Sequence, residues 1–147
     1  MTMNRKELLT RFIQEVWNEG NVEATGRYLA PRYTVRHDPG DPWHGKVLDL
    51  TEYKERLRRA LAPCPDQHFE LKELFADSNA VVATWFWTAT HTGELAGFPP
   101  SGRTLHMSGA TVYDFDGDRI TGHWQIIDRL GVFQQLRQTA SAEPVAG

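Results

Sequence analysis

An acidic residue closes an otherwise aromatic and apolar stretch near the end of the chain, His123 to Asp128 (HWQIID). Alternate side chains of a strand share a face, so Trp124, Ile126 and Asp128 are expected on one side. Partial burial of a carboxyl group disfavours its charged form and raises its pKa towards neutrality, where it can both accept and donate a proton. Asp128 is therefore a candidate general acid/base. The alternative is that it only caps a helix beginning near Arg129.

The preceding strand offers a partner for this acid. We interpret the turn at Asp116 and Gly117 as a three-residue loop with the glycine in the left-handed region. That register sets Thr104 opposite Asp128 and places His106 diagonal to the acid on the same face. A two- or four-residue loop would reverse the parity and send His106 to the other side. His106 is thus the second candidate catalytic residue, with an ordinary surface imidazole as the alternative.

The chain contains five tryptophans, which suit the walls of a site for a flat apolar ligand. In the stretch 81–92, Trp85, Trp87 and His91 share one side. We expect this side to line a pocket. The alternative for the two tryptophans is a plain core or a dimer interface.

Motifs for metals and nucleotides are absent from the sequence. It has no HExxH, CxxC, GxGxxG or Walker-type loop, and its six histidines lack paired metal-ligand spacing. The serines lack a nucleophile-elbow context, and Cys64 lies between two prolines without an adjacent base. We therefore expect acid/base chemistry with no metal and no cofactor.

Helices are expected before a run of long strands. Asn4 with Glu7, and Asp49 with Glu52, are typical of helix starts. From residue 68 the apolar period changes from 3.6 towards 2. We predict helices at 4–20, 22–29 and 49–61, strands at 33–37, 68–75, 81–92, 103–115 and 119–128, and a short helix around Phe133 and Leu136. This order predicts an α+β domain with helices on one face of a strongly curved antiparallel sheet and a pocket between them.

Composition restricts the partners. A length of 147 residues fits one domain, which we place at 1–140 with a flexible tail at 141–147. Interspersed charges with a net charge of −3 predict no nucleic-acid partner. The longest apolar runs fall short of the roughly 18 residues of a membrane span, and the charged start does not resemble a secretion signal, so we expect a cytoplasmic protein without a membrane partner.

Four segments together resemble the SnoaL-like polyketide cyclases over about residues 5 to 138. They are FIQEVWNEG (12–20), YTVRHD (33–38), THTGELAGFPP (90–100) with Gly102, and HWQIID (123–128) followed by QQL (134–136). The resemblance implies a cone-shaped curved antiparallel sheet with N-terminal helices over its concave face, the nuclear-transport-factor-2-like (NTF2-like) α+β barrel. It also implies a homodimer with an apolar pocket open at one end.

The resemblance further implies intramolecular aldol ring closure of an anthraquinone-type ester without metal or cofactor. In these cyclases the aspartate of the HWxxxD segment is the acid/base residue, and Asp128 matches it. We expect a small apolar aromatic, polyketide-like ligand. The residues expected to bind it are His37, Trp85, Trp87, His91 and Trp124. Rival interpretations are a cofactor-independent hydroxylase of polyketide rings and a non-catalytic binding protein.

Overall fold

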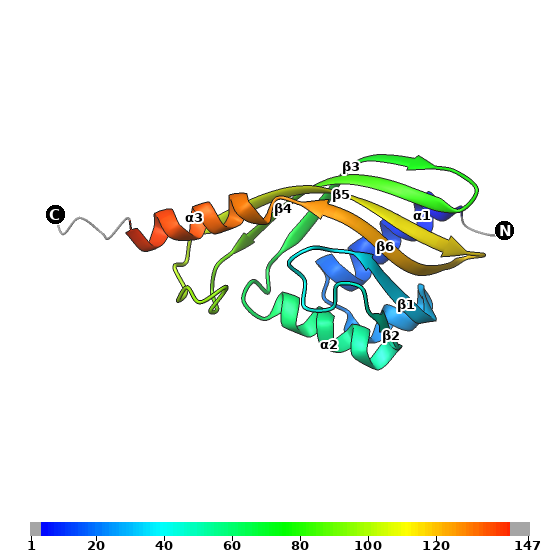
Figure 1. Cartoon of the computed structure of the whole chain (residues 1–147), viewed down its shortest axis with the longest axis horizontal. Coiled ribbons are helices and arrows are strands. Elements are labelled where there is room, and N and C mark those ends of the chain that lie inside the picture. Colours follow the sequence, from blue (N-terminus) through cyan, green and yellow to red (C-terminus); the bar gives the residue numbers. More distant parts are fainter. Residues whose placement is uncertain (1–3, 142–147) are drawn as a thin grey trace.

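The computed structural model describes residues 4–141, which form one six-stranded curved sheet with helices. The elements are α1 (Arg5–Phe12), the π-helix η1 (Ile13–Asn18), the 3₁₀-helix η2 (Val22–Arg27), β1 (Leu29–His37), β2 (Val47–Leu48), α2 (Leu50–Leu61), β3 (His68–Ala76), β4 (Ala80–Thr90), β5 (Thr104–Asp116), β6 (Arg119–Ile127) and α3 (Arg129–Ser141). The strand order is β2-β1-β6-β5-β4-β3. Figure 1 shows α1 and α2 on one side of the sheet and α3 running outward from its end. The predicted α+β fold is confirmed.

Both predicted helix starts are present. The Asn4 side chain accepts a hydrogen bond from the Glu7 amide, and Asp49 and Glu52 form a reciprocal capping box. The first helix extends to Asn18 as expected, but from Ile13 onward it is wound as a π-helix. A π segment adds one residue per turn, which the spacing of apolar residues does not reveal.

The sheet is more than the predicted antiparallel meander, because β1 pairs in parallel with β6, with Val35 beside His123. The last hairpin also differs from prediction. Gly117 has the expected positive φ of +59°, but Asp116 pairs with Arg119, which leaves a two-residue loop, and a register shift follows at Asp114 and Phe115.

This register corrects the predicted neighbour of Asp128. Thr104 pairs with Thr90 of β4. The Asp128 amide instead donates to the Ser108 carbonyl at 3.0 Å. The register is therefore four residues from the one predicted. Because four is an even number, His106 still falls on the Asp128 side of the sheet.

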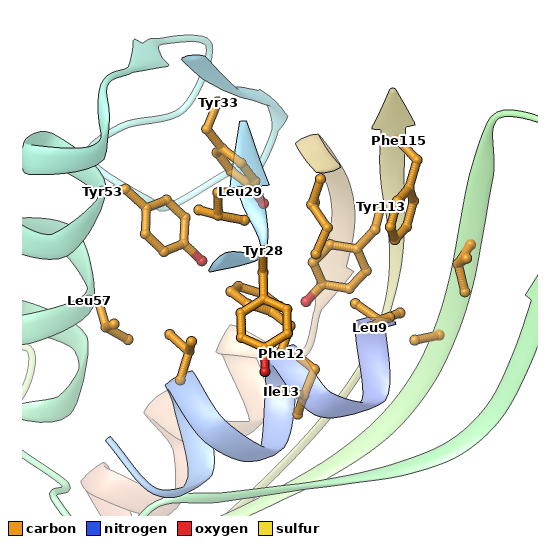
Figure 2. Close-up of a cluster of buried hydrophobic side chains, with 14 of the residues drawn as sticks. Leu9, Phe12, Ile13, Tyr28, Leu29, Tyr33, Tyr53, Leu57, Tyr113 and Phe115 are labelled. Atoms are coloured by element: carbon orange, nitrogen blue, oxygen red, sulfur yellow. The ribbon is translucent and has the colours of Figure 1, made fainter. Parts of the chain in front are cut away.

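Aromatic side chains of the helices pack against those of the sheet (Figure 2). Phe12 of α1 lies 5.8 Å from the ring of Tyr28 and 6.4 Å from that of Tyr113, measured between centroids. Tyr53 of α2 packs edge-on against Tyr33 of β1 at 4.8 Å. Such tilted and edge-on pairs stabilise a core beyond the area that they bury. The core therefore fixes α1, α2, β1 and β5 relative to one another.

The C-terminal helix is longer than predicted. It begins at Arg129, directly after β6, and ends at Ser141. Of the expected tail at 141–147, Ser141 thus belongs to α3 and the other six residues lie outside the described part. Within residues 4–141, no helix has the length and apolar character needed to cross a membrane.

Candidate active site

A cavity of about 400 Å³ lies on the helix side of the curved sheet. This volume is within the range of sites for small organic ligands. The apolar side chains of its wall come from η1, α2, β3 to β6, α3 and two loops, and include Ile13, Trp17, Ala60, Pro63, Phe69, Trp85, Trp87, Leu95, Ala96, Met107, Ile127, Val132, Phe133 and Leu136. The cavity therefore offers a ligand an apolar wall that contains several aromatic rings.

Two tryptophans of β4 are fixed in this wall by their ring nitrogens. Trp85 donates to the hydroxyl of Thr111 at 2.9 Å, and Trp87 donates to the amide oxygen of Gln67 at 2.8 Å. Gly109 of β5 is the cross-strand neighbour of Trp85 of β4, and a Cβ at Gly109 would collide with the indole ring. The missing side chain is what allows the Trp85 ring to lie over β5.

The polar end of the cavity is built on Asp38, which follows β1 and is completely buried. Its Oδ2 accepts hydrogen bonds from Nη2 of Arg56 (3.1 Å), Nε2 of His123 (2.8 Å) and Nε2 of Gln125 (2.7 Å). Its Oδ1 accepts from Nη2 of Arg129 at 2.8 Å. Four donors from three elements thus converge on one carboxylate.

The surroundings of Asp38 keep this carboxylate ionised. Burial by itself would raise the pKa of Asp38, but the hydrogen bonds from His123 and Arg129, with the charge of Arg129, outweigh burial and lower that pKa to about 2. Burial lowers the pKa of His123, and the charge of Arg56 adds to this effect, so the imidazole is neutral at pH 7. A neutral ring fits both of its contacts: Nε2–H donates to Asp38, and Nδ1 accepts from the Tyr33 hydroxyl at 2.6 Å.

Two of the groups that hold Asp38 also face the cavity, Gln125 from β6 and Arg129 from the first turn of α3. The amide oxygen of Gln125 accepts from Thr111 at 2.8 Å. Arg129 lies over Gly40, which has a φ of +94° and whose Cβ, if present, would be 2.9 Å from Cδ of the arginine. The structure therefore brings an amide and a guanidinium group to the polar end of an aromatic cavity.

The comparisons with known proteins identify the family of this fold. Residues 7–136 match the family model described as SnoaL-like polyketide cyclase. The chain belongs to the SnoaL-like polyketide cyclase family. A protein from Acidithiobacillus ferrooxidans, provisionally named a polyketide cyclase, is 60% identical, with a TM-score of 0.90 over 95% of this chain and 99% of that chain.

More distant solved structures share the fold of this SnoaL-like protein. IdmH from Streptomyces antibioticus, provisionally named a polyketide cyclase, is 23% identical, with a TM-score of 0.78 over 92% of this chain and 99% of that chain. AclR from Streptomyces galilaeus, provisionally named a hydroxylase, is 20% identical, with a TM-score of 0.77 over 91% of this chain and 96% of that chain. No curated protein matches the sequence.

In this SnoaL-like chain Trp85 and Trp87 lie in the cavity wall, as expected, but the two candidate catalytic residues do not. Asp128 is exposed and accepts a hydrogen bond from the Gly131 amide at 2.9 Å, which is the helix-capping alternative. His106 is exposed on the other side of the sheet, where its backbone N–H and C=O both bond to the side chain of Gln135.

The other three expected binding residues also lie outside the cavity wall. Trp124 is 37% exposed and stacks on His37, with the ring centroids 4.7 Å apart and the planes 15° from parallel. His91 is fully buried, and its Nδ1 lies 3.0 Å from the Ser101 hydroxyl. Trp124 lies outside the wall because side chains alternate along a strand: Gln125 and Ile127 face the cavity, so Trp124 faces the opposite side.

The sequence interpretation missed Asp38, Gln125 and Arg129. Asp38 directly follows the strand expected at 33–37, and Arg129 marks the expected start of a helix, so neither position alone indicates a site. The one available signal is in β6, where His123 and Gln125 are polar and alternate with the apolar Trp124 and Ile126. In the usual half-buried strand such an alternation predicts that the apolar side faces the interior, and β6 has the opposite arrangement.

Proposed function

We propose that this SnoaL-like protein closes a ring of an aromatic polyketide-type ester by intramolecular aldol addition, without a cofactor. The observation that supports this function best is the combination of a cavity walled by aromatic residues with N–H donors of Gln125 and Arg129 at its polar end. The apolar wall suits the planar body of such a substrate, and the donors suit its carbonyl oxygens.

The reaction needs one proton acceptor that later becomes a proton donor. A carbon acid between two activating groups loses a proton to a carboxylate, and the enolate carbon then attacks a ketone carbon to form the C–C bond. The ketone oxygen becomes an alkoxide and takes the proton back from the carboxylic acid. The product is an isomer of the substrate, so the atoms and electrons balance without an added reagent.

For this proton transfer we propose Asp128, as the sequence predicts. Its backbone lies between Ile127 and Arg129, which both line the cavity. The exposed side chain must leave the Gly131 amide to reach a substrate, at a cost of about 1 kcal/mol for a lost cap. Asp38 is the less suitable base, because it is sealed behind Gln125 and its pKa of about 2 makes it weakly basic. A catalytic role of His106 stays a prediction that its exposed position does not support.

Absorbance against time tests the proposal, with wild type and Asp128→Asn mixed with a panel of anthraquinone carboxylic-ester precursors in air and under nitrogen. Asparagine still caps a helix, so the variant keeps the fold and removes only the ionisable group. We expect equal turnover by wild type in both gases and a loss of about 100-fold in the variant.

The other outcomes distinguish the rival functions. Undiminished turnover by Asp128→Asn would remove this residue from the mechanism. A spectral change that needs air would indicate a hydroxylase. Tryptophan quenching by every precursor without any turnover would indicate a binding protein.

We also propose that the protein is a homodimer that pairs through the outer side of the sheet. The large exposed apolar side chains on this side include Phe75, Phe86, Trp124 and Ile126. Cross-strand pairing places their rows side by side over β3 to β6. Contiguous exposed apolar residues are typical of interfaces. Light scattering should give twice the chain mass for wild type and the chain mass for Ile126→Glu, and a monomeric wild type at micromolar concentration would contradict the proposal.

A further inference from the structure

The polar end of the cavity presents hydrogen-bond donors, and among the described residues no acidic side chain lines the cavity with them. Among residues 4–141, those lining the cavity include no aspartate, glutamate or histidine. The Gln125 amide nitrogen has two hydrogens and uses one on Asp38, and Arg129 uses two of its five N–H groups, on Asp38 and on the Pro39 carbonyl. Within the described part of the chain, no acceptor is found for the others. The complementary ligand group is therefore an oxygen that accepts hydrogen bonds.

The orientation of the Gln125 amide is fixed from both ends. The Trp85 ring nitrogen can only donate, so the Thr111 hydroxyl accepts from it and must give its own hydrogen to Gln125. The group facing Thr111 is therefore the amide oxygen. At the other end the ionised Asp38 can only accept, so the group facing it is the amide nitrogen. The donors are preorganised before a ligand arrives.

The charges around Asp38 are balanced without a ligand. Arg56 bonds to both Asp38 and Asp41, and Arg129 bonds to Asp38, so two guanidinium groups face two carboxylates while His123 is neutral. Preorganised dipoles and a paired guanidinium group stabilise charge that develops on an oxygen inside an apolar cavity. They do so without a change of protonation in the protein.

We propose that Gln125 and Arg129, positioned by Asp38, form an oxyanion site that binds the enolate or phenolate oxygen of a planar aromatic ligand. The identification of that oxygen as an enolate in catalysis rests on the proposed function. The binding of an anionic oxygen does not, and it can be measured without turnover. In this arrangement Asp38 is a positioning residue, and its two cavity-facing partners touch the ligand.

A planar phenol whose anion absorbs at longer wavelength than the acid is a suitable probe, and 2-hydroxyanthraquinone has this property. Its spectrum is titrated with pH in the free state and when bound to wild type, and binding is followed by tryptophan quenching. We expect the bound phenol to ionise at least 1 pH unit lower than the free phenol, which corresponds to a preference of about tenfold or more for the anion.

Substitutions of the two donor residues test whether they cause the shift in the pKa of the bound phenol. Gln125→Leu and Arg129→Met each remove donors from residues at the cavity surface and should each abolish most of the shift. Gln125→Glu should reverse it, because a second carboxylate beside Asp38 repels the phenolate. The matched control is Arg36→Met, since Arg36 also pairs with an aspartate, Asp114, but lies in an exposed ion pair outside the cavity wall. It should keep the wild-type shift.

The outcomes separate this inference from the proposed function. A shift that is lost in the donor variants supports the oxyanion site, and it does so even if no ester precursor is turned over, in which case only the proposed function fails. Turnover of a precursor together with an unshifted bound phenol would overturn the oxyanion site and leave the proposed function. Lack of probe binding, or an equal shift in Gln125→Leu, Arg129→Met and wild type, would also overturn the oxyanion site.

Discussion

Strand β6 has its polar and apolar residues on the opposite sides from those of an ordinary half-buried strand. On the helix side, Gln125 lies in the cavity wall and bonds to a buried carboxylate. On the outer side, Trp124 and Ile126 are exposed, and Asp128 beyond the strand end caps α3. The inner side therefore carries the polar group and the outer side carries the large apolar groups.

This contrast shows how an enzyme cavity can invert the usual strand pattern. An inward polar residue is tolerated only when its hydrogen bonds are made, and Gln125 makes them with Thr111 and Asp38. An outward apolar residue in a soluble protein is typical of a surface that another molecule covers. The predictions below compare changes on the inner side of the sheet with changes on the outer side, in their effects on stability and on activity.

The largest expected effect is on the inner side. Asp38→Asn should lower the free energy of unfolding by about 3–5 kcal/mol, because it leaves Arg129 without a counter-charge and Arg56 with Asp41 alone. Urea denaturation at pH 7 measures this loss. The control is Asp114→Asn, which breaks the exposed pair with Arg36 and should cost less than about 1 kcal/mol. Equal losses in the two variants would contradict the special position of Asp38.

Acid should remove the same contribution from wild type. The folded pKa of Asp38, about 2, is lower than the unfolded value of 3.8, so its ionisation stabilises the fold above pH 3.8 and this stability is lost as pH falls towards 2. The loss is about 2 kcal/mol. Urea denaturation at pH 4 and pH 2 should show this decline in wild type and a smaller one in Asp38→Asn. Parallel declines would show that Asp38 does not titrate in this window.

A smaller effect is expected from Thr111→Val, which breaks the link between Trp85 and Gln125. The amide loses its fixed orientation, so kcat should fall about tenfold with little change in KM. The control is Thr84→Val, because Thr84 lies on the outer side of β4, where it pairs with Ala110. Steady-state kinetics on a precursor that wild type converts would measure both, and a matching loss in the control would point to a general weakening of the sheet.

The smallest expected effect concerns the cap of α3. Asp128→Ala removes the acceptor for the Gly131 amide and should reduce the free energy of unfolding by about 1 kcal/mol. Asp128→Asn keeps an acceptor and should stay within about 0.5 kcal/mol of wild type. Urea denaturation of both variants measures the difference. If alanine costs nothing, the capping bond contributes nothing to stability.

Local features of the fold were predictable from the sequence. Capping pairs such as Asp49 with Glu52, the positive φ of Gly117 and the shared side of Trp85 and Trp87 depend on residues close together in the chain. The register at Asp128 was wrong because the turn is one residue shorter than expected and lies later in the chain, at Gly117 and Asp118, and a bulge adds one more residue.

The polar end of the cavity was not predictable in this way. Asp38 is 85 residues from His123 and 91 residues from Arg129 in the chain. Their contact depends on the parallel pairing of β1 with β6, which has no local signature in either strand. No spacing rule connects residues that only the completed sheet brings together.

The far wall of the cavity suggests how a ligand enters and leaves. The loop between β4 and β5 and helix α3 both contribute to the wall, and they touch through the rings of Phe98 and Phe133, 5.8 Å apart at 72°. One aromatic pair of this kind contributes about 0.5–1.5 kcal/mol beyond its buried area, which is comparable to thermal energy. Phe98 also packs on the buried cluster that includes Leu105 and Leu136, so opening of the loop away from α3 has to break more apolar contact than this ring pair alone.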